Sequence, residues 1–313
     1  MMQRFHLDSA TRDAYGQAIL RLGKENPDVY VIDCDVGKSC KTLSFAHELP
    51  NQYLNVGIAE QNACGVAAGL AACGKIPFVT TYAVFGSMRM AEQIRQTVCY
   101  PHLNVKIACS HGGVTPANDG ASHQGIEDMG ILRTLPNMTV TMGCDCVATR
   151  ALVRAAAAWD GPVYLRFTRD PVPCIYPEGA TFTIGKANCL REGTDATIIA
   201  TGDVMSLALI ASDTLRTKGI SVRVLDMHTI KPLDEAAVEK AVLETGRIVT
   251  VEDHTILNGL GSAVCETVAT LGKGRVLRLG IRDQFGESAP YEHILAKNGV
   301  TAEAIQHAVC SML

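Results

Sequence analysis

The sequence has few aromatic residues and no long apolar run. Phe, Trp and Tyr make up 5% of its 313 residues, whereas all hydrophobic types together make up 47%. This composition leaves Val, Ile, Ala and Leu to fill the core, which is typical of parallel sheets covered by helices. No apolar run reaches the roughly 18–20 residues that span a bilayer. The first residues also lack the apolar segment of a secretory signal. We therefore expect no membrane association.

Basic blocks and paired cysteine motifs are missing as well. The net charge is −4, and the absence of a basic stretch argues against nucleic-acid binding. The twelve cysteines are scattered; Cys144 and Cys146 form only a CxC motif, and no pair of CxxC motifs exists. A chain with this much core does not need a disulfide framework, so the cysteines indicate a reducing compartment and buried thiols. We predict a cytoplasmic protein whose own residues form no metal site.

Strands and helices are predicted to alternate through the first part of the chain. Apolar runs and helix-start signals give the following order: a helix over 8–25 with Asp8 or Ser9 as its N-cap, a strand over 28–33, a helix that begins at Glu60, a strand over 75–82, an exit loop over 83–86, a helix over 88–98, strands over 105–109 and 138–140, a helix over 147–159 and a strand over 163–167.

A second αβ unit follows a segment rich in Pro and Gly. Pro171, Pro173, Pro177, Gly179 and Gly185 interrupt regular structure, which places a domain boundary near residue 180. Beyond it we expect strands over 196–202, 220–225 and 247–252, with helices after the first and from residue 259. The sequence thus predicts an α/β protein of two domains, 1–180 and 181–313, each a mostly parallel sheet flanked by helices.

Candidate functional residues are concentrated in residues 55–128. Glu60 enters a helix otherwise built of Ala, Gly, Val and Leu, in the run Gly57-Ile58-Ala59-Glu60-Gln61. About fifty residues later come His111 and the run Asp119-Gly120-Ala121-Ser122-His123-Gln124. A carboxyl group in apolar surroundings has a raised proton affinity, and histidine exchanges protons near neutral pH. These residues are therefore candidates for acid–base chemistry.

These motifs resemble the pyrimidine-binding domain of the transketolase family of thiamine diphosphate enzymes. Tyr82 with Phe85 belongs to the same resemblance. The second half is similar to the C-terminal domain of the family in three segments: Ala200-Thr201-Gly202-Asp203, Val251-Glu252-Asp253-His254 and Asp283-Gln284-Phe285-Gly286-Glu287-Ser288. The resemblance covers nearly the whole chain and implies thiamine diphosphate as the cofactor.

The part of the family that binds the diphosphate has no counterpart here. That part carries a Gly-Asp-Gly motif and a downstream Asn, which hold the Mg²⁺ that bridges the phosphates, and this sequence contains no Gly-Asp-Gly. The resemblance therefore implies the C-terminal subunit of a split transketolase. We expect a partner chain, an N-terminal transketolase subunit, to supply the Gly-Asp-Gly motif and the magnesium ligands, and we expect self-association, as an α2β2 assembly.

The resemblance also assigns roles to individual residues. Glu60 would hydrogen-bond the aminopyrimidine ring, on which Phe85 would stack beside Tyr82. His111, His123 and Asp119 would contact the sugar, with both histidines in catalytic positions.

The resemblance also implies a second set of residues, at the positions where transketolases hold the phosphate tail of the sugar, and guanidinium groups suit phosphate. These residues are Arg12, Ser39 and Arg169. Arg166 is a further candidate, because the spacing Leu-Arg-Phe-Thr-Arg also resembles the deoxyxylulose-phosphate synthase pattern.

Three alternatives stay open beside ketol transfer. The same Glu60 motif fits a deoxyxylulose-phosphate synthase or the beta subunit of a 2-oxoacid dehydrogenase. His111 favours transketolase, because we expect an acidic pattern at that place in the synthase. A non-catalytic regulatory subunit is the third alternative, since fold resemblance alone does not establish activity.

Overall fold

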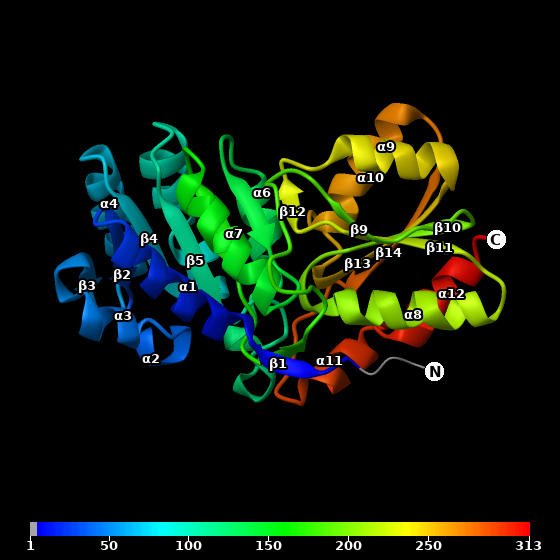
Figure 1. The fold of residues 1–313 in the computed structure, drawn as a ribbon, viewed down its shortest axis with the longest axis horizontal. Helices are drawn as coiled ribbons and strands as arrows, with labels where there is room; N and C mark the ends of the chain where they lie inside the picture. Colours follow the sequence, from blue (N-terminus) through cyan, green and yellow to red (C-terminus); the bar gives the residue numbers. More distant parts are fainter. Residues whose placement is uncertain (1–4) are drawn as a thin grey trace.

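The structure, a computed structural model, describes residues 5–313 and contains two α/β units (Figure 1). The first is built on a seven-stranded sheet in the order β12-β6-β7-β5-β4-β2-β3. All neighbours in this sheet are parallel except β12, which pairs antiparallel with β6. Its strands are β2 (Val29–Asp33), β3 (Tyr53–Asn55), β4 (Ile76–Tyr82), β5 (Lys106–Ser110), β6 (Thr139–Met142), β7 (Val163–Arg166) and β12 (Thr229–Lys231).

Helices cover both faces of this sheet. One face packs apolar side chains against α1 (Thr11–Glu25), α3 (Leu43–Glu48) and α7 (Cys146–Ala158). The other face packs against α4 (Glu60–Ala72), α6 (Asp128–Arg133) and a helical segment over 85–99. Short elements complete this half of the chain: α2 (Gly37–Cys40) and the 3-10 turns η1 (Pro50–Gln52), η4 (Ala117–Asp119) and η5 (Ala121–His123).

The second unit repeats this layering on a smaller sheet. Its order is β14-β13-β10-β11-β9, with only β9 antiparallel to its neighbour. The strands are β9 (Asn188–Arg191), β10 (Ala196–Ala200), β11 (Val222–Asp226), β13 (Arg247–Thr255) and β14 (Arg275–Ile281). The turn η6 (Gly202–Val204) precedes the first of its helices, which are α8 (Met205–Thr217), α9 (Glu235–Glu244), α10 (Leu260–Leu271), α11 (Tyr291–Lys297) and α12 (Ala302–Cys310).

The predicted fold class is confirmed, with two mostly parallel sheets between helices. The division of the chain near residue 180 stays a prediction. One strand crosses it: β12 comes after residue 180 in the sequence, yet it forms the edge of the seven-stranded sheet of the first unit. One hydrophobic core also continues from α4 and β4 to α9 and α10. Among residues 5–313, no helix is long and apolar enough to cross a membrane.

The first predicted helix begins three residues later than expected. Residues 7–10 form β1 (Leu7–Ala10), which pairs antiparallel with β8 (Pro171–Pro173). Neither Asp8 nor Ser9 caps α1, whose N-cap is Ala10. The hydroxyl of Thr168 instead accepts a hydrogen bond from the Thr11 N–H at 3.1 Å. A distant segment therefore satisfies the helix end that a local cap was expected to satisfy.

The exit loop predicted over 83–86 is also wrong. The chain turns directly into helix after β4, through the π-helical turn η2 (Phe85–Arg89), the α-helical turn α5 (Ala91–Gln93) and a second π-helical turn η3 (Ile94–Cys99). π-Helical turns are rare and often mark functional sites.

A buried arginine connects the two units. Arg166 at the end of β7 lies 3.0 Å from Asp128 at the start of α6, and both side chains are fully buried. The Arg166 guanidinium also donates to the Gly125 carbonyl and to the Asp253 carbonyl of β13, each at 2.9 Å. Tyr164 donates its hydroxyl proton to Asp128 at 2.5 Å. One cation therefore holds a loop, a helix and a strand of the other unit together.

We predict that Arg166→Met lowers the free energy of unfolding by about 3–5 kcal/mol, because it leaves the Asp128 carboxylate buried without its counter-ion. Denaturant-induced unfolding measures the loss. The matched control is Arg21→Met, since Arg21 makes an exposed ion pair with Glu25 and such pairs contribute at most about 1 kcal/mol. Equal stability of the Arg166 variant and the wild type would contradict the assignment.

Candidate functional site

The site forms where two paired strands end. β4 ends at Tyr82 and β5 ends at Ser110, and these two residues are partners in the parallel ladder. Phe85 follows the first strand and His111 follows the second. Because carboxyl ends of parallel strands share one edge of the sheet, the chain segments that follow them lie side by side. The Tyr82 and His111 rings are 4.0 Å apart between centroids.

An aromatic cluster joins four predicted site residues. His123 lies 5.9 Å from Tyr82 and 5.8 Å from Phe85, and the Tyr82 and Phe85 rings are 6.0 Å apart. His111 is buried, whereas the other three are half-buried. Tyr82 and Phe85 are distant in the sequence from His111 and His123, yet the fold brings the two pairs to one place. Together they form an aromatic wall on which a planar ring could stack.

Glu60 is the first residue of α4, and only 2% of its surface is exposed. Its Oε2 lies 2.9 Å from an Nη1 of Arg89. The same guanidinium lies over the Phe85 ring, with its Cζ 4.5 Å from the ring centroid. Glu60 is therefore buried, as its Ala- and Gly-rich helix suggested, but its surroundings are not purely apolar.

His111 is held neutral by its position. Its Nδ1 lies 2.7 Å from the Ser110 hydroxyl, and its backbone has a positive φ of 63°. Burial, followed by the positive charges of Arg12 and Arg169 and by His123, lowers the pKa of His111 to about 3. A histidine with this pKa is uncharged at neutral pH, so it can donate one hydrogen bond and accept another.

The predicted anion-binding residues lie next to this cluster. Arg169 forms an ion pair with Asp119, at 3.2 Å from Nε to Oδ2. Arg12 donates from Nη1 to the Ser39 carbonyl at 3.1 Å, and its Nε is buried with no hydrogen-bond partner among residues 5–313. An unpaired buried donor on a cation is suited to an anionic ligand.

Arg166 does not belong to this site. Its guanidinium is fully buried and its hydrogen bonds go to Asp128, Gly125 and Asp253 inside the protein. The prediction that it contacts a substrate phosphate is corrected on this ground. Within the run Leu165-Arg166-Phe167-Thr168-Arg169, only the second arginine lies beyond the strand and reaches the site.

Two residues of the site were missed in the sequence. Arg89 falls in the predicted helix over 88–98, and only the folded chain shows that it meets Glu60. Ser110 precedes His111 directly, and a hydroxyl next to a candidate catalytic histidine is a signal that the sequence did offer. The Ser110 hydroxyl also lies 3.1 Å from the Cys40 thiol, which gives it a second hydrogen-bond partner beside His111.

The motif Glu252-Asp253-His254 supports the site without entering it. Glu252 accepts the N–H groups of Leu260 and Gly261 at the start of α10. Asp253 accepts the Val114 N–H three residues beyond His111, at 3.0 Å. His254 accepts the Gly130 N–H at 3.0 Å, and burial lowers its pKa to about 4. The second unit thus fixes the backbone on either side of the loop that carries Asp119 and His123.

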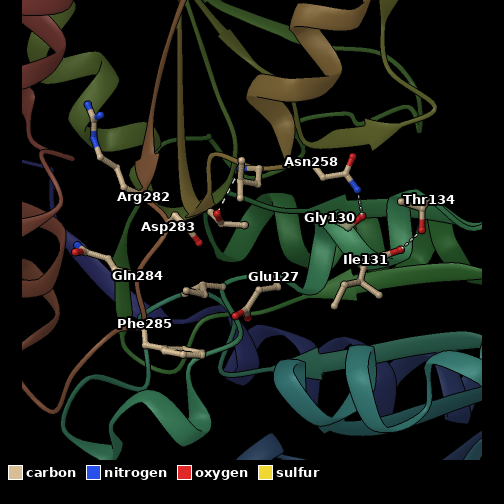
Figure 2. A pocket seen from close by; sticks show the side chains of 12 residues that line it. Glu127, Gly130, Ile131, Thr134, Asn258, Arg282, Asp283, Gln284 and Phe285 are labelled. Carbon is tan, nitrogen blue, oxygen red and sulfur yellow. Dashed lines mark hydrogen bonds between the residues drawn. The ribbon is translucent and has the colours of Figure 1, made fainter.

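A cavity of about 510 Å³ opens between the two units, beyond this loop. Figure 2 shows Glu127 opposite the segment Arg282–Phe285 of the second unit. Phe285 is exposed, and burial raises the pKa of Glu127. None of the predicted site residues lines this cavity, so it is separate from the aromatic cluster.

The arrangement around Glu60 fits one end of thiamine diphosphate. The aminopyrimidine ring needs a hydrogen-bonding carboxyl group at its edge and an aromatic face for stacking, and Glu60 and Phe85 are close enough to contact one guanidinium together. Among residues 5–313, no three His, Cys, Asp or Glu side chains are grouped to hold a metal ion.

Two family patterns match the chain. The pattern described as the pyrimidine binding domain of transketolase matches residues 8–173, and that of the C-terminal domain of transketolase matches residues 185–305. Glu60, Phe85, His111, Asp119 and His123 all lie within the first match.

Relatives and solved structures agree with these patterns. A putative transketolase C-terminal section of Methanocaldococcus jannaschii is 44% identical over 94% of this chain and 93% of its own length. A 6-deoxy-6-sulfo-D-fructose transketolase subunit of Clostridium is 40% identical over 95% of this chain and 92% of its own. A solved split-gene transketolase, described as an inactive beta4 tetramer, superimposes with a TM-score of 0.89 at 45% identity and covers 96% of this chain and 97% of its own.

We predict that His111 stays unprotonated over the whole pH range in which the protein is folded, because its pKa is lowered to about 3. Nuclear magnetic resonance of the ¹⁵N-labelled imidazole rings measures this directly. Arg169→Gln should raise the pKa by removing a nearby positive charge, and Arg21→Gln, far out on α1, should not. Titration of wild-type His111 near its ordinary value of about 6.5 would contradict the prediction.

Proposed function

The chain belongs to the transketolase family, and we propose that it is a subunit of a thiamine diphosphate-dependent transketolase that transfers a two-carbon ketol unit between sugar phosphates. The observation that carries this proposal is the buried Glu60 carboxyl, which the Arg89 guanidinium connects to the Phe85 ring of the aromatic cluster. A structural role alone does not require a buried carboxylate and an aromatic ring to share one guanidinium.

Three residues would hold the pyrimidine end of the cofactor. Phe85 would stack on the ring, Tyr82 would close the wall beside it, and Glu60 would share a proton with a ring nitrogen. When bound, thiamine diphosphate supplies the carbanion chemistry that breaks and forms the carbon–carbon bond. The work of this chain is to orient the ring and to place a carboxyl group where a proton can be exchanged.

The histidines and the ion-paired residues would bind the sugar. Neutral His111 can hydrogen-bond a carbonyl or hydroxyl group of the substrate. The rings of His111 and His123 both lie close to the Tyr82 ring. Asp119 can accept a hydrogen bond from a sugar hydroxyl while it stays in contact with Arg169. Arg12, Ser39 and Arg169 would surround the anionic tail of the substrate. The Clostridium relative, which is named for a sulfonated sugar, is consistent with a site selective for an anionic tail.

A partner chain completes this proposal. We infer that an N-terminal transketolase subunit brings the Gly-Asp-Gly motif, the downstream Asn and the Mg²⁺, and that the assembly is α2β2. The relative from Methanocaldococcus, named as a C-terminal section, supports a division of the enzyme between two chains. Gly65 and Gly69 lie on the exposed face of α4, where a Cβ meets no atom of residues 5–313, which leaves room for close packing of another subunit. Twelve free cysteines support the expectation of a reducing, cytoplasmic location.

We predict that the purified chain alone has no transketolase activity and binds thiamine diphosphate weakly. Activity should appear when the partner chain, the cofactor and Mg²⁺ are added together. The measurement is ketol transfer from xylulose 5-phosphate, run in parallel with pyruvate as the donor to separate this function from the synthase and dehydrogenase alternatives. Turnover by the chain alone at the rate of the complex would overturn the split-subunit proposal, and turnover of pyruvate alone would favour the alternatives.

Glu60→Gln should lower turnover of the reconstituted complex by at least about a hundredfold, because general acid–base groups contribute factors of roughly 10² to 10⁴. The amide keeps the size of the side chain but cannot share the proton. Glu92→Gln, a substitution on the exposed side of α5, is the matched control and should leave the rate unchanged. Full activity of the Glu60 variant would contradict its assigned role.

A further inference from the structure

A single guanidinium contacts both residues that the proposed function assigns to the pyrimidine ring. Arg89 lies 2.9 Å from Glu60 Oε2 and, with its Cζ 4.5 Å from the centroid, over the Phe85 ring. A guanidinium group is planar, donates hydrogen bonds at its edge and stacks on aromatic faces. Arg89 thus makes the two interactions expected of an aminopyrimidine ring at this place, a hydrogen bond to Glu60 and stacking on Phe85.

The local backbone explains how Arg89 reaches this place. It is the last residue of the π-helical turn that Phe85 begins, four positions after Phe85. Residues at this spacing lie on the same side of a helix, so the arginine side chain folds back over the ring. The side chain is 48% exposed, whereas that of Glu60 is 2% exposed. Arg89 is therefore free to swing toward solvent, and Glu60 is not.

From these contacts we propose that Arg89 occupies the pyrimidine position in the free chain and must be displaced when the cofactor binds. The inference rests on the proposed function, since it takes Glu60 and Phe85 as the ligands of the ring. Both contacts use the atoms that the ring needs: the free edge of the carboxylate and the face of the phenyl group. Arg89 and the ring therefore compete for one place.

The charge of Arg89 leads to the same conclusion. Arg89 pairs its charge with the Glu60 carboxylate, whereas the proposed role of Glu60 requires the same carboxyl group to bond the ring. An Arg89 that stayed in place would oppose that role. In the free chain, however, it compensates a carboxylate that would otherwise be buried without a counter-ion. The contact thus stabilises the free subunit and lowers its affinity for cofactor.

The first arm of the test needs only this chain. Thermal unfolding is measured for the wild type, Glu60→Gln, Arg89→Met and the double variant. If the two side chains are bonded, the shifts in Tm are not additive: the double variant should unfold at least about 2 °C above the sum of the single shifts. Additive shifts would show that Arg89 does not hold Glu60 and would overturn the proposal.

The second arm measures thiamine diphosphate binding by titration calorimetry in the complex with the partner chain. Removing the competitor should tighten binding, so Arg89→Met should lower the Kd. We expect a decrease of about fivefold to tenfold, because the free energy of a half-exposed charged contact lies between that of an exposed ion pair and that of a buried one. Arg95→Met, which removes the same charge from an exposed position on the next turn, should leave the Kd unchanged. An unchanged or raised Kd in the Arg89 variant would overturn the proposal.

The two proposals fail differently in this design. If Glu60→Gln abolishes turnover while Arg89→Met leaves the Kd unchanged, only the displacement of Arg89 is refuted. If the wild-type complex binds no thiamine diphosphate, or if Glu60→Gln is fully active, the proposed function itself is refuted, and with it the role of Arg89.

Discussion

The buried charge of Arg166 is the constraint around which the site is arranged. A guanidinium removed from water is costly unless its partners surround it, and here the partners come from three places: the Asp128 carboxylate, the Gly125 carbonyl and the Asp253 carbonyl. The chain from His111 to Gly125 carries most of the proposed sugar-binding groups. Gly112 packs against the Arg166 side chain so closely that a Cβ at that position would overlap it. The loop is therefore fixed at both of its ends by one cation.

The second unit takes part in the site through the same cation. Asp253 receives the Val114 N–H on its carboxylate and offers its carbonyl to Arg166. Burial, followed by repulsion from Asp203, raises the pKa of Asp253 well above its usual range. The Arg166 guanidinium acts in the opposite direction and lowers that pKa. The second unit therefore helps to position His111 and His123, although it contributes no side chain to the aromatic cluster.

The fold was predictable because it depends on local sequence patterns. Parts of the site were not predictable because they depend on contacts between residues distant in the sequence. Apolar runs and helix starts give the alternation of strands and helices, which the structure confirms. The start of α1 was missed because residues 7–10 become a strand only by pairing with residues 171–173. Arg166 and Arg169 look alike in the sequence. Their different positions depend on where β7 ends and on which backbone groups surround each side chain. A run of five residues specifies neither.

The contact between Glu60 and Arg89 shows how a half-built site can be stable. The N-terminus of α4 favours the negative charge of Glu60, but a helix end alone does not compensate a carboxylate that is almost fully buried. Arg89 supplies the remaining charge and keeps about half of its own surface in water, so its desolvation is small. Ile58 and Met88, which neighbour this pair in sequence, expose large apolar side chains. A carboxylate meant to exchange protons with a ring needs cover that excludes water. The side chain paired with Glu60 is a long, half-exposed arginine. Its ability to leave is what makes the same position available to a ligand.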